Sequence, residues 1–144
     1  QNQNTKFEYL TINEGLSSNR IYCIYRDSRD YLWIATELGL DRYDSDRIKS
    51  YRFINADSRT ISNNSVKTIY EQSNGNLWFG TDNGLNLYDR KTDSFKRFYH
   101  FQTDTNSLNS NAVKSIIEDK NHVLWVLTDG DCLNRWNPES ENFS

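Results

Sequence analysis

The chain has 144 residues and a formal net charge of −3, because 20 aspartate and glutamate residues outnumber 17 lysine and arginine residues. This balance does not favour a nucleic-acid partner, which usually requires a basic stripe. Apolar residues make up only 35% of the sequence, but aromatic residues reach 14% and each can bury a large area. No apolar run reaches the roughly 20 residues of a membrane helix, so any membrane contact would come from a missing downstream segment.

A unit of about 45 residues is written three times. Its clearest mark is a tryptophan inside an apolar run, at Trp33, Trp78 and Trp125, spaced by 45 and 47 residues. A Ser/Asn-rich segment ends 14 residues before each tryptophan, and an apolar run follows that segment. A fixed period of this length predicts a repeat architecture.

The first unit reads as short strands separated by polar turns. Its second strand carries the unbroken apolar run 32–35, which predicts burial on both faces. The fourth strand does not alternate cleanly, because its apolar residues are three apart, and a β-bulge would explain this spacing. The expected strands are 7–10, 20–26, 31–36, 40–43 and 48–53.

The same scheme recurs to Phe143, and no helical periodicity is sustained anywhere. Four strands per unit are typical of a β-propeller blade. The sequence therefore predicts an all-β chain of about three four-stranded antiparallel blades, a fragment of a larger propeller. The expected parts are a leading outer strand at 1–12, blade 1 at 13–54, blade 2 at 55–101, and blade 3 at 102–144 with its fourth strand truncated.

The repeated tryptophans are interpreted as core residues that pack blade against blade, rather than as platforms for stacking sugars. The threonine three residues after each tryptophan is expected to tie its hydroxyl to a neighbouring turn. Gly39 and Gly84 suit a turn that needs positive φ. In the third unit Cys132 stands in the glycine position, after one extra residue.

The Ser/Asn segments are interpreted first as turns whose side chains bond local backbone. In a propeller, loops at this place open onto one face of the central channel, where ligands commonly bind. The candidate ligand-binding residues on the channel face are Asn19, Arg20, Asn64, Lys67, Asn111 and Lys114.

Little in the sequence indicates catalysis. His100 and His122 have no metal-ligand spacing, and no C-x-x-C pattern occurs. Cys23 reads as a small core residue within a strand. We expect no catalytic, metal or cofactor site, although a serine, histidine and carboxylate set stays open.

These motifs together resemble a known family. Leu-Trp-x-x-Thr, Gly-Leu and Leu-Ser-x-Asn are similar to the two-component regulator propeller repeats of hybrid histidine kinases from Bacteroides-type gut bacteria. The resemblance runs from about Gly15 to Phe143, and Cys132 departs from it. The residues on the family's characteristic positions are Trp33, Thr36, Gly39, Trp78, Thr81, Gly84, Trp125 and Thr128.

The resemblance implies that the chain is the N-terminal part of a periplasmic sensor domain of a hybrid two-component system histidine kinase. Such sensors respond to glycan breakdown products and control polysaccharide utilization. It also implies an oligosaccharide ligand for the full sensor, and no enzyme activity and no nucleic-acid binding for this fragment. Because the sequence has no methionine, we expect Gln1 to be a processed or engineered terminus, most simply after removal of a signal peptide.

Two other functions stay open: a free-standing carbohydrate-binding propeller, and a glycan-cleaving propeller enzyme. The strand count also indicates an association. Three blades are fewer than the 4–8 of typical propellers, so two fragments could form a homodimer with six blades. In that dimer each leading strand would complete the third blade of the other copy.

Overall fold

The computed structural model describes residues 7–144, and within them it is all-β apart from one short 3₁₀ helix, η1 (Ile12–Glu14). The strands form three four-stranded antiparallel sheets of consecutive strands, which are the predicted blades. Blade 1 contains β1 (Ile21–Arg26), β2 (Leu32–Thr36), β3 (Leu40–Tyr43) and β4 (Ile48–Tyr51). Blade 2 contains β5 (Val66–Glu71), β6 (Leu77–Thr81), β7 (Gly84–Asp89) and β8 (Ser94–Phe98). Blade 3 contains β9 (Val113–Glu118), β10 (Leu124–Thr128), β11 (Cys132–Asn137) and β12 (Asn142–Phe143).

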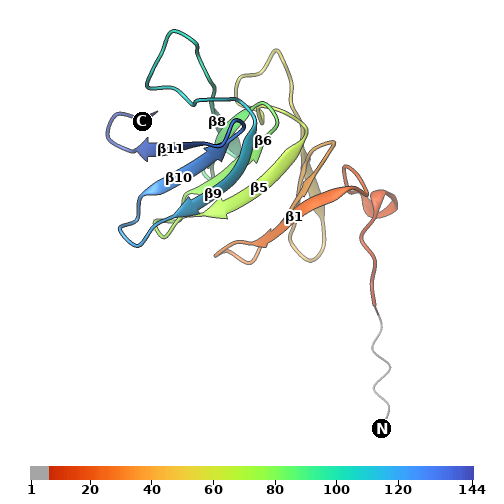
Figure 1. The fold of residues 1–144 in the computed structure, drawn as a ribbon. Helices are drawn as coiled ribbons and strands as arrows, with labels where there is room; N and C mark the ends of the chain where they lie inside the picture. Colours follow the sequence, from red (N-terminus) through yellow and green to blue (C-terminus); the bar gives the residue numbers. More distant parts are fainter. Residues whose placement is uncertain (1–6) are drawn as a thin grey trace.

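The three blades stand next to one another with their first strands side by side. Figure 1 shows β1, β5 and β9 as successive neighbours along one edge of the arc. Each is an edge strand of its own sheet, so these three are the innermost strands of the propeller fragment. The long connections 52–65 and 99–112 mark one end of the blades, here called the loop end. The turns 27–31, 72–76 and 119–123 mark the opposite end, here called the hairpin end.

The second strand of the middle blade is the most deeply buried element. All five residues of β6 are buried, because blades 1 and 3 cover both of its faces. In β10 burial alternates, since only one face of blade 3 has a neighbour. The predicted two-sided burial is therefore confirmed for β6 and for residues 33–36 of β2, which are all buried, but not for β10.

Aromatic side chains fill the space between blades. Between blades 1 and 2 the ring centroids of Trp33 and Phe79 are 5.0 Å apart. Between blades 2 and 3 the centroids of Trp78 and Trp136 are 5.2 Å apart. Each interface is a separate apolar cluster, so neighbouring blades stabilise each other as in other repeat proteins.

The spacing of three in the fourth strands has another cause than the expected bulge. Phe95 packs into the cluster between blades 1 and 2, whereas Phe98 packs against the cluster between blades 2 and 3. Residues three apart in a strand lie on opposite faces, so β8 presents an aromatic ring to each neighbour. The pairing of β4 and β8 with the third strands is regular, and the register irregularities lie in the innermost strands, such as β1 between Ile21 and Cys23.

The expected leading strand is not formed by the residues that the structure describes. Part of the interval 1–12 lies outside them. Residues 7–11 belong to no strand, Phe7 and Tyr9 are 74% and 77% exposed, and η1 begins at Ile12. A strand needs an adjacent sheet edge, and the short outer strand β12 lies at the far end of the arc from this segment (Figure 1).

Candidate functional site

The repeated tryptophans hold the hairpin end of each blade. The indole N–H of Trp33 donates to Asp27 at 2.8 Å, and that of Trp78 donates to Gln72 at 2.8 Å. Both rings are fully buried, so their interpretation as core residues is confirmed. Trp125 keeps the same hydrogen bond in blade 3 but is only half-buried, because it lies on the face of blade 3 that has no neighbour.

The repeated threonine and glycine close the turn between the second and third strands. In blades 1 and 2 the threonine hydroxyl donates to the glycine carbonyl oxygen at 2.8 Å. These pairs are Thr36 with Gly39 and Thr81 with Gly84. Gly84 has a φ of 114°, and an added Cβ would come within 3.0 Å of a carbonyl oxygen, so glycine is required there. In blade 3 the carbonyl oxygen of Cys132 accepts from Thr128 at 3.3 Å.

The Ser/Asn segments are anchored to the third strands. The N–H and hydroxyl of Ser17 donate to the buried carboxylate of Asp41 at 2.7 and 2.6 Å. In blade 2 the N–H of Ser62 donates to the buried Asn86, at 2.8 Å. The side chains also bond local backbone, as when Ser18 accepts from the N–H of Arg20 at 3.0 Å. The structural interpretation of these segments is therefore confirmed.

The candidate asparagines each use their side-chain oxygen to hold the preceding loop. Asn19, Asn64 and Asn111 accept backbone N–H bonds of 3.0, 2.7 and 2.6 Å, from Ile12, Phe53 and His100 respectively. Their amide N–H groups, which make no hydrogen bond within residues 7–144, are left to contact a ligand.

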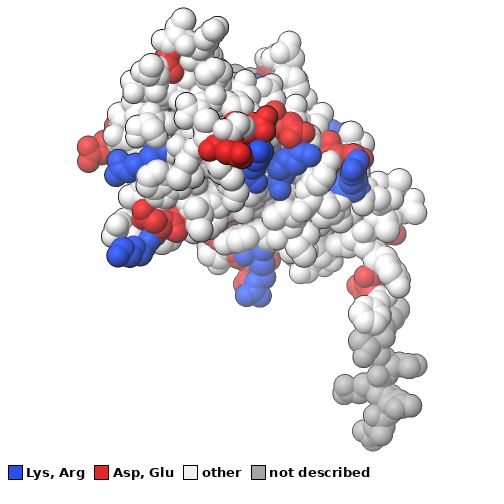
Figure 2. Space-filling model, in the orientation of Figure 1, with Lys and Arg blue, Asp and Glu red and all other residues white. Residues whose placement is uncertain are grey.

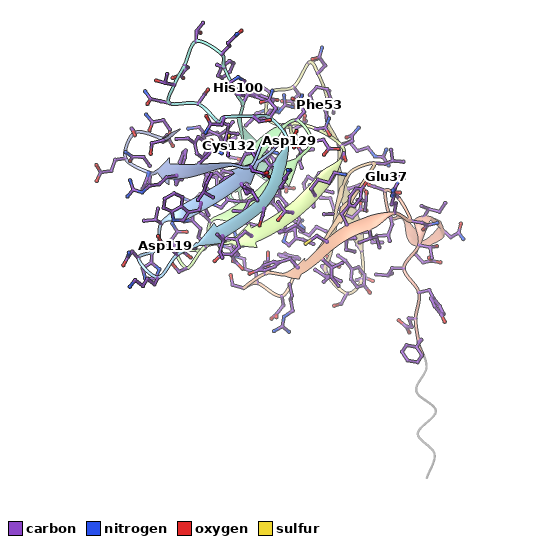
Figure 3. The ribbon with its side chains drawn as sticks, in the orientation of Figure 1. Glu37, Phe53, His100, Asp119, Asp129 and Cys132 are labelled. Carbon is purple, nitrogen blue, oxygen red and sulfur yellow. The ribbon has the colours of Figure 1, made fainter. Side chains whose placement is uncertain are left out.

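The candidate cations Arg20, Lys67 and Lys114 lie in a row near the loop end of the innermost strands. Each faces an acidic side chain of its own blade, namely Glu37, Asp82 and Asp129, at 3.3, 3.5 and 3.1 Å. Hydrogen bonds to Asp129 and Asp131 raise the pKa of Lys114. Figure 3 shows Glu37 and Asp129 toward the loop end, and Asp119 at the hairpin end. Figure 2 shows basic and acidic side chains intermixed on the visible face, so no stripe of one charge lies there.

One of these cations also links two blades. The ammonium group of Lys67 in β5 lies 3.7 Å from the ring centroid of Tyr22 in β1. A cation over an aromatic face at this distance is attracted by the ring. The row is thus a surface of paired charges and one exposed aromatic ring, suited to a polar ligand rather than to an anion.

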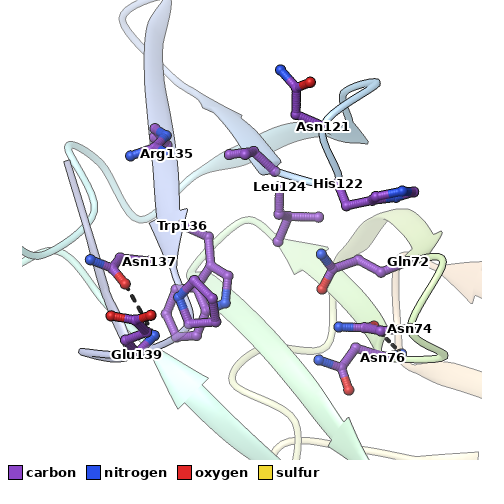
Figure 4. A pocket seen from close by; sticks show the side chains of 12 residues that line it. Gln72, Asn74, Asn76, Asn121, His122, Leu124, Arg135, Trp136, Asn137 and Glu139 are labelled. Carbon is purple, nitrogen blue, oxygen red and sulfur yellow. Dashed lines mark hydrogen bonds between the residues drawn. The ribbon is translucent and has the colours of Figure 1, made fainter.

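A second candidate site lies at the hairpin end between blades 2 and 3. It is a cavity of about 360 Å³, within the roughly 300–1,000 Å³ of typical ligand sites. Gln72, Asn74 and Asn76 from blade 2 face His122 and Arg135 from blade 3 across it (Figure 4). The sequence interpretation missed this cavity.

Comparison with known proteins decides the identity of the units. The two-component regulator propeller family matches three segments of the chain, residues 15–37, 60–83 and 107–130. These segments contain the Ser/Asn turns, the innermost strands and the tryptophan strands described above. These are two-component regulator propeller repeats.

Two solved structures are similar over most of the chain. The extracellular domain of BT3049 from B. thetaiotaomicron, described as a hybrid two component system, is 29% identical with a TM-score of 0.86, over 95% of this chain. That of BT4673 from the same organism is 27% identical with a TM-score of 0.70, over 90% of this chain. The present chain covers 19% and 18% of those two chains, so it spans about one fifth of their length.

A more distant structure shares the fold alone. Virginiamycin B lyase from Staphylococcus aureus is 19% identical with a TM-score of 0.61, over 83% of this chain and 39% of its own. No curated protein matches the chain at a significant level.

One serine, histidine and carboxylate set does occur in the regulator propeller repeats. The hydroxyl of Ser73 lies 2.9 Å from Nδ1 of His122, and Glu118 contacts the same Nδ1 at 3.4 Å. A catalytic triad needs the serine and the carboxylate on different ring nitrogens. This set is therefore a structural contact between repeats, and His122 itself is exposed.

Within residues 7–144 no group of three histidine, cysteine, aspartate or glutamate side chains could hold a metal ion. Over the same residues no helix has the length and apolar character needed to cross a membrane. Cys23 and Cys132 are free thiols, and burial raises the pKa of Cys23.

Proposed function

We propose that this chain is part of the periplasmic sensor region of a hybrid two-component histidine kinase, which signals in response to glycan breakdown products. The observation that carries the proposal is the combination of three regulator propeller repeats with 29% identity, over 95% of the chain, to the extracellular domain of BT3049. The similar extracellular domains belong to signalling systems rather than enzymes. The chain itself is therefore a sensing surface without enzyme activity, and the kinase lies elsewhere in the protein.

Phosphorylation of the complete sensor tests this proposal. Membrane vesicles that contain the sensor are mixed with ATP and with oligosaccharide digests of single polysaccharides. We expect phosphorylation to change with one digest and not with the others. A complete gene without a membrane segment or kinase motifs would favour a free-standing carbohydrate-binding propeller. Cleavage of a polysaccharide by the chain would indicate an enzyme.

The row of Arg20, Lys67 and Lys114 is the proposed ligand surface at the loop end. Its support is the position on the innermost strands, where side chains of successive blades come together. A sugar hydroxyl could accept from a lysine and donate to the paired carboxylate. Replacing Lys67 by alanine should then weaken the response to the glycan without changing the basal phosphorylation level.

The two ends of the arc support a proposal of self-association. On the leading face Ile21 and Ile24 are 44% and 63% exposed, whereas their equivalents in blade 2, Val66 and Ile69, are buried against blade 1. The trailing face exposes Ile117 in the same way. Apolar faces of this kind associate in water, so the leading face of one copy should accept the trailing face of another.

In the proposed homodimer, residues 1–12 of each copy would complete blade 3 of the other. Its short strand β12 pairs with β11 through only two residue pairs, so the outer edge of blade 3 is open. Light scattering on the chain tests the arrangement. A monomer of 17.0 kDa that is unaffected by dilution or by deletion of residues 1–10 would contradict it.

A further inference from the structure

The two interblade interfaces use the same contacts at the hairpin end. Between blades 1 and 2 the N–H and hydroxyl of Ser28 donate to Glu71 at 2.8 and 2.6 Å. Between blades 2 and 3 the N–H and hydroxyl of Ser73 donate to Glu118 at 2.8 and 2.7 Å. Because these contacts repeat, any difference between the two interfaces comes from other positions.

The first interface is closed by an arginine. The guanidinium of Arg90 donates to Asp27 at 2.8 Å and to Glu71 at 2.9 Å. The side chain of Arg90 is only 15% exposed, and those of Asp27 and Glu71 are 0% and 7% exposed. Arg90 therefore fills the space between blades 1 and 2 and satisfies the carboxylates on its walls.

The second interface has neither an arginine at the position of Arg90 nor an aspartate at the position of Asp27. Pro138 follows Trp136 by two residues just as Arg90 follows Tyr88, and the turn to the fourth strand has the same length in both blades. Gln72 stands where blade 1 has Asp27. Proline has no side chain that can reach across, and the cavity of about 360 Å³ occupies the position that Arg90 fills in the first interface.

The wall of this cavity carries a buried amide with an unused donor. Gln72 is 6% exposed, and its Oε1 accepts from Trp78 at 2.8 Å. Its Nε2 donates to no atom of residues 7–144, and the side chain lines the cavity, as Figure 4 shows. No buried side-chain nitrogen or oxygen of residues 7–144 lacks a hydrogen-bond partner, so this Nε2 is open to solvent through the cavity. The amide is therefore free to donate to a polar group that takes the place of solvent there.

The remaining walls determine the chemistry of that occupant. Arg135 can donate and Glu139 can accept, and the structure gives neither side chain a partner within residues 7–144. These two opposite charges leave the cavity without a strong net charge. The buried Leu124 and Trp136 provide an apolar wall. Donors and acceptors beside an apolar surface match a ring that carries several hydroxyl groups.

We propose that this cavity between blades 2 and 3 binds one neutral sugar unit of an oligosaccharide. The proposal rests on the glycan-sensing function proposed above and places a site at the hairpin end, opposite the row of cations. The Nε2 of Gln72 donates to one sugar hydroxyl, Glu139 accepts from another, and Trp136 contacts the apolar face of the ring.

The first interface shows which substitutions should close this cavity. The double variant Gln72→Asp with Pro138→Arg reproduces in the second interface the Asp27 and Arg90 pair of the first. Aspartate is compatible with this position, because Asp27 and Asp119 accept from the tryptophans of blades 1 and 3. The matched control is Lys91→Glu, which gives the turn of blade 2 the residue that blade 3 has at Glu139.

The experiment is a titration of the ¹⁵N-labelled chain with maltose, cellobiose, lactose and sucrose, up to about 10 mM for weak binding. We expect one disaccharide to shift the side-chain amide signals of Gln72 and Asn76. The double variant should lose this binding at least tenfold, and Lys91→Glu should keep it. Gln72→Asp alone, which replaces the free donor by a carboxylate, should weaken binding about tenfold.

Two results would overturn the inference. One is that none of the four sugars shifts the signals of Gln72 or Asn76. The other is equal affinity in the wild type and in a folded Gln72→Asp variant. Neither result bears on the sensor proposal, because phosphorylation of the complete sensor is measured separately. If the sensor responds to a glycan but no sugar binds in this cavity, the glycan must be recognised elsewhere in the protein.

Discussion

Ser73 donates two hydrogen bonds to Glu118, from its N–H at 2.8 Å and from its hydroxyl at 2.7 Å, and so joins the turn of one blade to the innermost strand of the next. Hydrogen bonds from Ser73 and His122 lower the pKa of Glu118 against the opposing effect of burial. The acceptor therefore stays charged at neutral pH. At one end of the arc, Lys120 of blade 3 occupies the position of the donor Ser73. At the other end, Arg26 of blade 1 occupies the position of the acceptor Glu118.

Arg26→Glu should strengthen self-association. In a head-to-tail dimer Arg26 would meet Lys120, and two cations would stand where the internal interfaces have serine and glutamate. Replacing this repulsion by an ion pair is expected to lower the dimer dissociation constant about tenfold. Sedimentation equilibrium measures the constant. Arg29→Glu is the control, and an equal gain from it would show a general charge effect instead.

Arg90→Leu should destabilise the fold. The variant leaves the fully buried carboxylate of Asp27 without its cation, and breaking a buried pair in this way costs about 3 kcal/mol. Urea unfolding measures the free energy of unfolding. Adding Asp27→Asn to the variant should recover part of the loss, because the unpaired charge is then removed. If the double variant were less stable than the sum of the two single effects predicts, loss of the ion pair would not explain the destabilisation.

Trp78→Ala should cost roughly 3–5 kcal/mol of unfolding free energy, as expected for a large aromatic side chain removed from a packed interface. Trp78 is fully buried between blades 2 and 3, and it contacts Phe98 and Trp136. Phe101→Ala is the control, because Phe101 is 57% exposed and should cost less than about 1 kcal/mol. A similar cost for both variants would contradict the assignment of Trp78 to the core.

The outer rim between blades 1 and 2 should lose stability in acid. Partial burial of Asp93 opposes its charge, but hydrogen bonds from Lys49, Tyr88 and Tyr51 lower its pKa from 3.8 to about 2. The folded pKa lies below the unfolded one, so this stabilisation is complete above about pH 4 and disappears as the pH falls through 2. After allowance for solvent screening it amounts to about 1 kcal/mol. The free energy of unfolding of the wild type and of Asp93→Asn, measured between pH 2 and 6, tests this contribution. The same pH dependence in both proteins would contradict it.

Most of the fold follows from the period of the sequence. The spacing of the tryptophans and the unbroken apolar run around Trp33 were sufficient to predict four-stranded blades with a buried second strand. The threonine and glycine contacts in the turns of blades 1 and 2 were predicted because their chemistry is local. The expectation of a bulge in the fourth strand was wrong, because a spacing of three can equally place Phe95 and Phe98 on opposite faces of a strand whose blade has two neighbours.

The cavity between blades 2 and 3 could not be predicted in the same way. It depends on which side chain crosses an interface between segments far apart in the sequence. The signal lies in a departure from the repeat, since Pro138 replaces an arginine and Gln72 replaces an aspartate. Aligning the repeats singles out Gln72, because the other two copies have Asp27 and Asp119 there, whereas all three copies differ at the position of Pro138. The size of the space and the free amide required the structure.

Gly80 in β6 lies so close to blade 3 that an added Cβ would come 2.5 Å from Cγ1 of Val113. The equivalent residue of blade 1 is Ala35, which is also small and fully buried, whereas that of blade 3 is Leu127. A further blade packed against blade 3 would meet the larger side chain of Leu127 at the position where blades 2 and 3 meet Ala35 and Gly80. The residue at this one position of the second strand therefore limits how closely the next blade can approach.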